Sequence, residues 1–362
     1  MPRTPPTPLM PAPPPVAPAP LIEAIAALAN RRSLTESQSA AVFGTVMRGE
    51  ATPAQIAALL MGLRVKGETA DEVAGAARAL RDAMVPVEAS GDHLVDTCGT
   101  GGGTVPTFNI STAAAFVAAG AGASVAKHGN RSFTSLCGSA DVLEALGVRI
   151  SLDAAEAGRV LREACITFLF APNFHPAMKH AGPVRRELGV HTTFNLLGPL
   201  TNPARAPFQI LGVWHRSLIE PVASVLALLG AEKAWVVHGA DGLDEITLTR
   251  ETFVAACSTG SGVETFTISP HDFGLERRSL DGARGSGSAE NAQLIRAILQ
   301  GREEENFAAA RDLVVINAAA ALHIAGLASD LRQAASLARE SIESGRAASK
   351  LEALIGETNR KG

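Results

Sequence analysis

The chain has 362 residues, a length that predicts one large domain together with a smaller one. Hydrophobic residues make up 46% of it and aromatic residues only 4%, and the formal net charge is −4, with the 32 basic residues scattered along the sequence. Proteins that bind nucleic acid usually concentrate basic residues on one surface, so this distribution argues against a nucleic-acid partner.

The cysteines and the apolar runs indicate the cellular compartment. The four cysteines are far apart and form no CxxC pair, which is typical of the reducing cytoplasm and argues against structural zinc. No apolar run approaches the roughly 20 residues that a membrane-spanning helix needs. We therefore expect a cytoplasmic protein without a membrane segment.

The first 90 residues divide into a tail and a helical segment. Residues 1–20 contain ten prolines and one charged residue, which predicts a disordered tail. Residues 21–90 have helical periodicity throughout, with cap signals such as Thr52 before Pro53 and Thr69 before an acidic first turn. We expect a small all-helical domain whose apolar faces serve packing or dimerisation.

Residues 91–362 alternate short β-branched runs with helical segments, which predicts an α/β domain with a mostly parallel central sheet. The expected strands are residues 93–98, 123–128, 166–171, 209–214, 233–239, 245–249 and 263–269. The expected helices are residues 111–122, 139–147, 153–164, 175–188, 217–230, 288–301, 310–328 and 329–355. Ligands of such sheets gather beyond the carboxyl ends of the strands.

Two loops that follow expected strands carry groups suited to phosphate. The first contains four glycines around Thr100 and leads into a helix that begins near Asn109, Ser111 and Thr112, whose side chains can cap the free amides or leave them to an anion. The second loop brings basic and amide side chains: Lys127, His128, Asn130 and Arg131. Converging amides, hydroxyls and cations indicate a phosphate site.

Two acidic residues, Asp244 and Glu245, follow a glycine-containing turn at the start of an expected strand. Carboxylate oxygens suit Mg²⁺, which keeps several waters and also binds substrate phosphates, and the Ser111 hydroxyl could add a ligand. Adjacent side chains of a regular strand point to opposite sides, so both acids could act together only if the turn is distorted. A solvated acidic turn remains an alternative for the dipeptide alone.

Arg185 lies ten residues after His175 in one expected helix, nearly three turns, so the two side chains should project to similar sides. A guanidinium offers a planar fork to a carboxylate. An ordinary surface arginine is the alternative. No Ser-His-Asp arrangement and no metal-spaced histidine pair accompanies them in the sequence.

The motifs GTGG, TFNIST, KHGNR, GSADVLEALG, HPAMK, PVRRELG, TFNLLGPLTNP and HGADGLDE, in this order, resemble the anthranilate phosphoribosyltransferase family. The resemblance extends to the helical segment and to SAENA and RDLVVINAAAAL, and so covers the chain apart from the proline-rich tail. It implies a nucleoside-phosphorylase-like phosphoribosyltransferase fold and a homodimer formed through the helical domain, which helices near residues 176–200 could complete.

The resemblance also implies the reaction. The amine of anthranilate displaces diphosphate from 5-phosphoribosyl 1-diphosphate and gives N-(5-phosphoribosyl)anthranilate, a step of tryptophan biosynthesis. Mg²⁺, as two ions, is the implied cofactor. Because the amine is already a usable nucleophile, positioning and stabilisation of the leaving group suffice, and we expect no catalytic acid or base.

The resemblance assigns residues to three groups. The phosphoribosyl diphosphate is expected to contact Gly99, Gly102, Gly103, Thr107, Asn109, Ile110, Ser111, Thr112, Lys127, His128, Gly129, Asn130, Arg131, Ser135 and Ser139. Anthranilate is expected to contact Gly99, Asn130 and Arg185, with His128 and His175 as neighbours. The metal is expected to contact Ser111, Asp244 and Glu245.

One departure from the family pattern lies in the first loop, where Gly103 replaces the acid that usually follows GTGG. We expect altered Mg²⁺ dependence with activity retained. Two other functions stay open at this point: a pyrimidine-nucleoside phosphorylase of the same fold, and a non-catalytic paralogue that binds nucleotides or nucleic acid.

Overall fold

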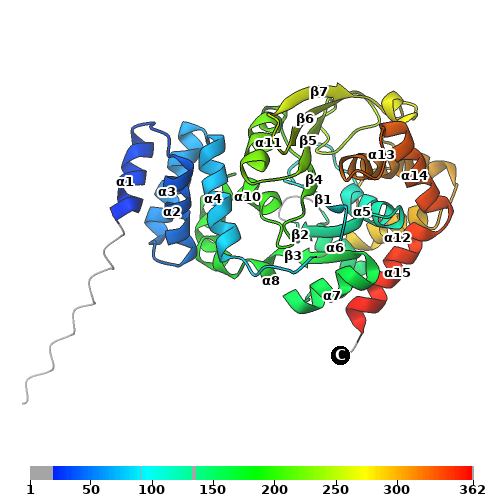
Figure 1. The fold of residues 1–362 in the computed structure, drawn as a ribbon, viewed down its shortest axis with the longest axis horizontal. Helices are drawn as coiled ribbons and strands as arrows, with labels where there is room; N and C mark the ends of the chain where they lie inside the picture. Colours follow the sequence, from blue (N-terminus) through cyan, green and yellow to red (C-terminus); the bar gives the residue numbers. More distant parts are fainter. Residues whose placement is uncertain (1–18, 90, 133–135, 361–362) are drawn as a thin grey trace, which may run out of the picture.

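The computed structural model describes residues 19–89, 91–132 and 136–360. A bundle of helices occupies one end of the molecule, and a larger α/β body forms the rest (Figure 1). None of the helices within these ranges is long and apolar enough to cross a bilayer. The expected combination of a small helical part and a mostly parallel sheet is confirmed.

The bundle contains α1 (Ala19–Ala29), α2 (Glu36–Met47), α3 (Pro53–Lys66) and α4 (Ala70–Ala83). A threonine precedes each of the last three helices, and its side-chain oxygen accepts a hydrogen bond from the third helical amide: Thr35, Thr52 and Thr69. In each case a Gln or Glu side chain at that third position bonds back to the threonine amide, which completes a capping box. The helix starts are therefore determined by local sequence.

Close packing of α2 against α4 depends on Gly75. A Cβ at this position would lie 2.2 Å from the Glu36 carbonyl oxygen, so only glycine allows the two backbones to approach this closely. Beside this contact the fully buried Glu72 carboxylate accepts hydrogen bonds from the Leu34 amide at 2.9 Å and from Lys66 Nζ at 2.8 Å. The Glu72 carboxylate thus joins α4 to the end of α3 and to the segment before α2.

The sheet has seven strands in the order β3-β2-β1-β4-β5-β6-β7. Their bounds are β1 Leu94–Gly99, β2 Ser124–Gly129, β3 Ile166–Phe170, β4 Phe208–Gly212, β5 Lys233–Gly239, β6 Thr252–Ser258 and β7 Glu264–Ile268. The first five strands pair in parallel, and β6 and β7 are antiparallel additions at one edge.

Helices cover both faces of this sheet (Figure 1). They are α5 Ile110–Gly120, α6 Ser139–Ala145, α7 Ala154–Ala164, α8 Ala171–Phe174, α9 Gly182–Leu188, α10 Phe194–Leu200, α11 Ile219–Leu228, α12 Ser288–Leu299, α13 Ala308–Ile324, α14 Leu331–Glu343 and α15 Arg346–Asn359. Short 3₁₀ helices are Pro176–His180, Arg216–Leu218, Pro270–Phe273 and Glu305–Phe307. The alanine-rich α5 and α13 are buried on nearly all sides and contact each other behind the sheet.

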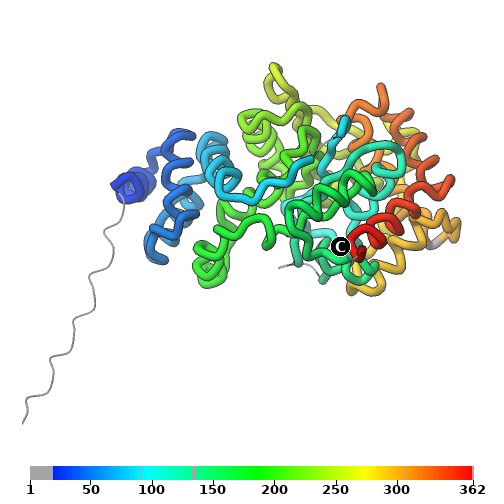
Figure 2. Tube along the Cα trace, turned by 60° about the horizontal axis from the view of Figure 1, so that its bottom comes forward, coloured from blue at the N-terminus to red at the C-terminus, as the bar shows by residue number. Residues whose placement is uncertain are grey.

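Two hydrophobic cores lie on opposite faces of the sheet. On β5, Trp235 and Val237 belong to the core with α5 and α13, whereas Ala234 and Val236 belong to the core with α11, because successive strand residues point to opposite faces. The second core continues through α9 and α10 into the helical bundle. Figure 2 shows the green segment of residues 176–200 beside the blue and cyan helices.

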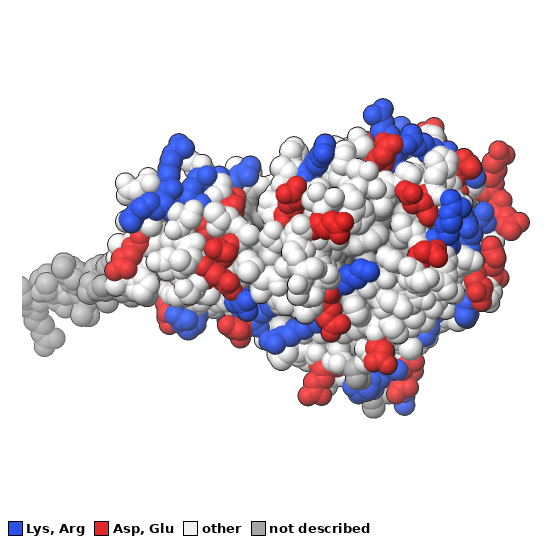
Figure 3. All heavy atoms as spheres, turned by 45° about the horizontal axis from the view of Figure 1, so that its top comes forward, with Lys and Arg blue, Asp and Glu red and all other residues white. Residues whose placement is uncertain are grey.

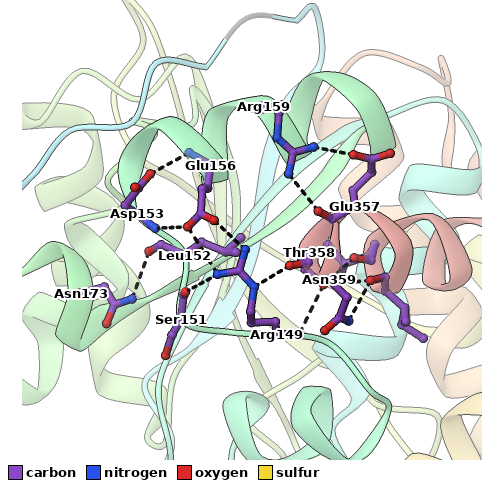
Figure 4. A network of polar contacts seen from close by, with 12 residues as sticks. Arg149, Ser151, Leu152, Asp153, Glu156, Arg159, Asn173, Glu357, Thr358 and Asn359 are labelled. Carbon is purple, nitrogen blue, oxygen red and sulfur yellow. Dashed lines mark hydrogen bonds and ion pairs between the residues drawn. The ribbon is translucent and has the colours of Figure 1, made fainter. Parts of the chain in front are cut away.

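The C-terminal helix α15 is held against α7 by a polar network (Figure 4). Arg149 bonds Glu156 at 2.6 Å and the Thr358 carbonyl oxygen at 2.6 Å, and Arg159 pairs with Glu357. These charged residues therefore link α15 to α7 and to the segment before it.

On the face that Figure 3 shows, basic and acidic side chains are interspersed over the surface.

Three sequence predictions of elements were wrong. Residues 245–249 form no strand, and the antiparallel neighbour of β5 is instead β6, which was not expected. The helix expected over 175–188 is broken, because Pro183 has no amide hydrogen and its ring would clash with the preceding turn. The helix expected over 329–355 is two helices separated by Gly345, whose φ of 75° ends the first helix.

Candidate functional site

The site lies at the carboxyl edge of the sheet, where the chain order reverses. From β1 the chain proceeds first to β2 and β3 on one side and later to β4 and β5 on the other, and in such sheets this switch point is where a ligand crevice is expected, beyond the ends of β1 and β4. Four of these parallel strands end in glycine: Gly99, Gly129, Gly212 and Gly239. The strand ends therefore leave room for loops and ligand to approach the backbone.

The glycine loop (residues 99–103) packs directly against Asp244. Gly101 and Gly102 have φ of 67° and 84°, a conformation that favours glycine. A Cβ at Gly103 would lie 2.4 Å from Asp244 Oδ1, and a Cβ at Gly212 would lie 1.7 Å from the Asp244 carbonyl oxygen. Glycine is thus required at position 212, where the obstacle is backbone, whereas a side chain at position 103 would displace the Asp244 carboxylate.

The acid turn (residues 239–246) carries two neighbouring carboxylates, those of Asp244 and Glu245. Both residues are partly buried. Burial raises the pKa of Asp244, and the hydrogen bond from the Gly103 amide only partly offsets this effect. Burial, and then the charge of Asp244, raise the pKa of Glu245 to about 8, against the opposing effects of Lys127 and of hydrogen bonding from Ser111. A cation in front of both acids would remove this unfavourable charge concentration.

The donor set fits Mg²⁺. Within the described ranges no three His, Cys, Asp or Glu side chains cluster to hold a metal by themselves. Two carboxylates and a hydroxyl nevertheless match a cation that usually takes one or two carboxylates and completes its shell with waters and substrate phosphates. Because Asp244 follows a turn and not a strand, the two acids are not constrained to opposite faces.

Lys127 lies beneath this crevice and is 4% exposed. Its ammonium group donates to the Thr97 carbonyl oxygen and, at 3.2 Å, to Ser111 Oγ. Burial lowers the pKa of Lys127, while Asp96, Cys98 and Glu245 oppose that effect. Lys127, Ser111 and Glu245 are therefore brought together from β2, α5 and the acid turn.

The start of α5 differs in detail from the sequence prediction. Asn109 occupies the cap position, but its side chain makes no cap bond; Nδ2 donates to the Cys137 carbonyl oxygen, and Oδ1 accepts from Asn291 at 3.1 Å. The Ile110 side chain is buried and its amide is bonded to Phe108, and the Thr112 side chain is also buried. The Asn109 side chain and the Ile110 amide, which the sequence predicted to be available for a cap or an anion, thus have partners within the protein.

Other residues predicted to contact the phosphoribosyl diphosphate lie in the segments after the glycine loop and after β2. Thr107 forms an isolated antiparallel bridge with Arg284. A Cβ at Gly129 would lie 2.2 Å from Ser139 Oγ, and Ser139 donates to the Asn130 carbonyl oxygen at 3.3 Å. Ser135 lies outside the described residues.

Arg131 is already engaged by acidic side chains of α6. Its Nη1 bonds Asp141 at 2.8 Å and Glu144 at 2.6 Å, and the side chain is about half exposed. The guanidinium is thus held at the rim and not in the crevice. A direct contact with a phosphate would require it to exchange these surface partners.

Two buried histidines meet below the basic loop (residues 127–131). His128 Nε2 and His175 Nε2 are 3.2 Å apart, and His128 Nδ1 lies 3.0 Å from the Gly198 carbonyl oxygen. Since only a protonated nitrogen can bond a carbonyl, His128 carries its hydrogen on Nδ1 when neutral. Burial lowers the pKa of His128 to about 3 and that of His175 to about 4, so both rings are neutral at physiological pH.

Arg185 is half-buried in α9, with its guanidinium carbon 5.2 Å from the centre of the Phe194 ring. Among the described residues no carboxylate forms an ion pair with it, and burial lowers the pKa of its guanidinium. The helix break before α9 means that Arg185 and His175 do not share one helix face, contrary to the sequence prediction. A half-buried guanidinium without a carboxylate partner is suited to bind an anionic ligand.

Several residues of this region were not expected from the sequence. The Asp96 carboxylate accepts from the His128 amide at 3.2 Å and from Asn202 Nδ2 at 2.8 Å, and thereby joins β1 to the basic loop. Burial raises the pKa of Asp96 to about 6, against the charge of Lys127. Gly212 lies inside the expected strand of residues 209–214, so the sequence did not mark it as a strand end, and nothing local distinguishes Asn202 from any loop asparagine.

The chain matches two family models. The Glycosyl transferase family, helical bundle domain, matches residues 22–84, and the Glycosyl transferase family, a/b domain, matches residues 91–348. Among curated relatives, anthranilate phosphoribosyltransferase of Chloroflexus aggregans is 52% identical over 92% of this chain and 97% of its own length. The enzyme of that name from Moorella thermoacetica is 52% identical over 89% and 94%, respectively.

Solved structures of the same name are also similar. Anthranilate phosphoribosyltransferase from Thermus thermophilus gives a TM-score of 0.87 with 42% identity, over 93% of this chain and 99% of that one. The Saccharomyces cerevisiae enzyme in complex with PRPP and Mg gives 0.83 with 28% identity, over 94% and 98%. The same yeast protein in complex with 4-fluoroanthranilate gives 0.83 with 27% identity, over the same shares.

Proposed function

The chain belongs to the anthranilate phosphoribosyltransferase family, and on this premise we propose which of its residues bind the two substrates and the metal. The protein transfers the phosphoribosyl group of 5-phosphoribosyl 1-diphosphate to the amine of anthranilate, in tryptophan biosynthesis. Similarity over about nine-tenths of the chain favours this reaction over the pyrimidine-nucleoside phosphorylase and the non-catalytic paralogue.

The observation that carries the assignment of residues is the convergence of the glycine loop, Ser111, Lys127 and the acid turn at one crevice. The donor binds there through the residues named from the sequence: Gly99, Gly102, Gly103, Thr107, Asn109, Ile110, Ser111, Thr112, Lys127, His128, Gly129, Asn130, Arg131, Ser135 and Ser139. Support is strongest for the glycine loop, Ser111 and Lys127, and weakest for Ile110 and Arg131, whose groups have partners within the protein.

Asp244, Glu245 and Ser111 hold Mg²⁺, as two ions, together with the donor diphosphate. When bound, the metal stabilises the negative charge that develops on the departing diphosphate. The Asp244 carboxylate lies against the glycine loop, in space that a side chain at position 103 would fill. Lys127 contributes positive charge below the same crevice.

Anthranilate binds near Arg185, with Gly99, Asn130, His128 and His175 as neighbours. The unpaired guanidinium suits the anthranilate carboxylate. The neutral histidines add polar surface without a second positive charge. These residues orient the amine toward the ribose carbon and exclude water, and no protein group needs to take a proton before attack.

The direct test is the loss of anthranilate fluorescence on mixing with 5-phosphoribosyl 1-diphosphate, with and without Mg²⁺. We expect consumption that depends on both the donor and the metal. Consumption of phosphate and a pyrimidine nucleoside, without consumption of anthranilate, would instead establish the phosphorylase. A folded protein inactive in both assays would favour the non-catalytic paralogue.

The protein forms a homodimer through the helical bundle, which is separated from the α/β domain near residue 90 and completed by helices of residues 176–200. Support comes from the shared core of these helices and from exposed apolar side chains at this end of the molecule: Ile22, Val65 and Val190 are 53%, 68% and 49% exposed. We expect Val65→Glu to convert the dimer to a monomer in light scattering. A wild-type monomer would contradict the proposal.

The protein acts in the cytoplasm. Cys98, Cys165 and Cys257 carry free thiols, which is typical of a reducing compartment.

A further inference from the structure

A buried asparagine of α13, Asn317, holds the residue that immediately follows the acid pair. Its Oδ1 accepts a hydrogen bond from the Ile246 amide at 3.0 Å, and its Nδ2 donates to the Ile246 carbonyl oxygen at 3.0 Å. Nδ2 also donates to the Leu313 carbonyl oxygen at 2.9 Å, one helical turn earlier. Asn317 is 2% exposed and Ile246 is 1% exposed, so water does not replace these bonds.

This pair of bonds supplies what a neighbouring strand would otherwise provide. Residues 245–249 have the β-branched composition of a strand, yet no strand pairs with them. One side-chain amide that bonds both the N–H and the C=O of a single residue fixes the position and the orientation of that residue. Because the Ile246 amide nitrogen belongs to the peptide unit of Glu245, the clamp also limits rotation of the backbone that carries Glu245.

The other contacts of the acid turn act on different residues. Asp241 Oδ1 accepts from the Leu243 amide at 3.2 Å, and Thr252 Oγ1 accepts from the Thr247 amide at 3.1 Å. The acids themselves accept hydrogen bonds from the Gly103 amide at Asp244 and from Ser111 at Glu245. Within the described chain, Asn317 is the side chain that bonds the Ile246 backbone.

We propose that Asn317 is a positioning residue for metal binding, which holds Asp244 and Glu245 in place through Ile246. The proposal rests on the proposed function, since the assignment of the metal to these acids belongs to it. An uncharged amide performs this task without competing with the acids for the cation. The asparagine lies 71 residues beyond Ile246 in the sequence, so α13 takes part in the site without touching substrate.

The test measures Mn²⁺ binding to the full-length protein by electron paramagnetic resonance. The titration contains a fixed concentration of 5-phosphoribosyl 1-diphosphate and no anthranilate, and a protein-free titration is subtracted. Asn317→Leu removes both bonds at similar volume. We expect its dissociation constant for Mn²⁺ to rise about 10- to 100-fold, as for other residues that orient metal ligands.

A second variant keeps the test valid if Asn317→Leu does not fold. Asn317→Asp preserves the size of the side chain and an acceptor for the Ile246 amide, but loses the donor to the Ile246 carbonyl oxygen. Its added negative charge by itself favours a cation. Weaker Mn²⁺ binding by Asn317→Asp would therefore support the positioning role without an electrostatic explanation.

Ser341→Ala is the matched control. Ser341 is fully buried and donates to the Val117 carbonyl oxygen at 2.8 Å, so this variant also loses a buried side-chain bond between helices, but none at the acid turn. We expect its Mn²⁺ affinity to stay within about twofold of wild type. Hydrogen exchange of the Ile246 amide should accelerate in the Asn317 variants and not in the control.

The outcomes separate the two proposals. Wild-type Mn²⁺ affinity in both Asn317 variants, with faster exchange at Ile246, would overturn the positioning role and leave the proposed function intact. Equal weakening by Ser341→Ala would also overturn it, because global stability would then explain the effect. Wild-type protein that binds no Mn²⁺ with the donor present would overturn the metal assignment itself and this proposal with it.

Discussion

Arg185 is a half-buried cation. Its guanidinium contacts the ring of Phe194 and has no carboxylate partner among the described residues. We expect Arg185→Ala to raise the KM for anthranilate by about one to two decades, since a charge-assisted hydrogen bond contributes roughly 1.5–3 kcal/mol. The KM for the phosphoribosyl donor should change little. Steady-state kinetics with each substrate varied in turn would measure both constants.

The neighbouring Arg186 provides a control for that experiment. It belongs to the same helix and is exposed, so Arg186→Ala should leave both KM values near those of the wild type. Equal losses for both substrates in Arg185→Ala would show that Arg185 serves the donor or the fold instead.

Gly103 is the residue at which this chain departs from the family pattern, and the structure gives the departure a steric meaning. A side chain there would collide with the Asp244 carboxylate, 2.4 Å from the added Cβ. We expect Gly103→Ala to raise the Mg²⁺ concentration at half-maximal velocity, because Asp244 must move. Gly103→Asp should shift it by a different amount, since a third carboxylate then faces the metal.

The measurement for both Gly103 variants is velocity against Mg²⁺ concentration at saturating substrates. The difference between the alanine and aspartate curves isolates the effect of charge from that of displacement. Three superimposable curves would show that Asp244 does not set the metal requirement, and that the departure at position 103 has no consequence.

At the scale of secondary-structure elements, the helical bundle depends on one buried ion pair. Glu72 of α4 is fully buried and bonds Lys66 at the end of α3 and the Leu34 amide before α2. We expect Glu72→Ala to destabilise the protein by about 3–5 kcal/mol, because it leaves the Lys66 charge and the Leu34 amide without a partner. Urea unfolding monitored by circular dichroism would measure the loss.

An exposed ion pair of the same bundle is the control. Glu36 pairs with Arg78 at the surface, and Glu36→Ala should cost no more than about 1 kcal/mol. Similar losses in the two variants would mean that the buried pair contributes no more than a solvent-exposed one. That outcome would contradict the role that burial gives to Glu72.

At the scale of the whole molecule, the paired histidines couple folding to pH. The folded protein protonates His128 only near pH 3 and His175 only near pH 4, whereas the ordinary histidine pKa is 6.5. Between these values the unfolded chain binds more protons than the folded one, so stability falls as the pH is lowered below about 6.5. Burial is the main cause, and for His128 the neighbouring His175 and then the charge of Lys127 lower the pKa further.

Replacement of one imidazole should reduce this dependence. His175→Gln cannot titrate, and its amide can still donate to His128. We expect the free energy of unfolding to fall less steeply between pH 6.5 and 5 than in wild type, by up to about 1.4 kcal/mol per pH unit. Urea unfolding at several pH values would check this, and parallel pH dependences in the two proteins would contradict it.

Local sequence determined much of the fold. Threonine caps, Pro53 and the periodicity of apolar residues specified the starts of α2, α3 and α4, because each signal acts within one helical turn. The alternation of β-branched runs with helices likewise predicted all five parallel strands. The motifs placed the glycine loop, the basic loop and the acid turn at the carboxyl edge of the sheet, because parallel strands end on the same side.

Only the tertiary structure decided which partners these residues have. The β-branched residues after Glu245 suit a strand, but β6 pairs with β5 and the Asn317 side chain takes the bonds of Ile246. The contact of Gly212 with Asp244 and the meeting of His128 with His175 likewise join residues more than thirty positions apart. Local propensity acts over a few residues, whereas these contacts depend on how distant elements pack, so sequence patterns identified the chemistry and the fold determined its geometry.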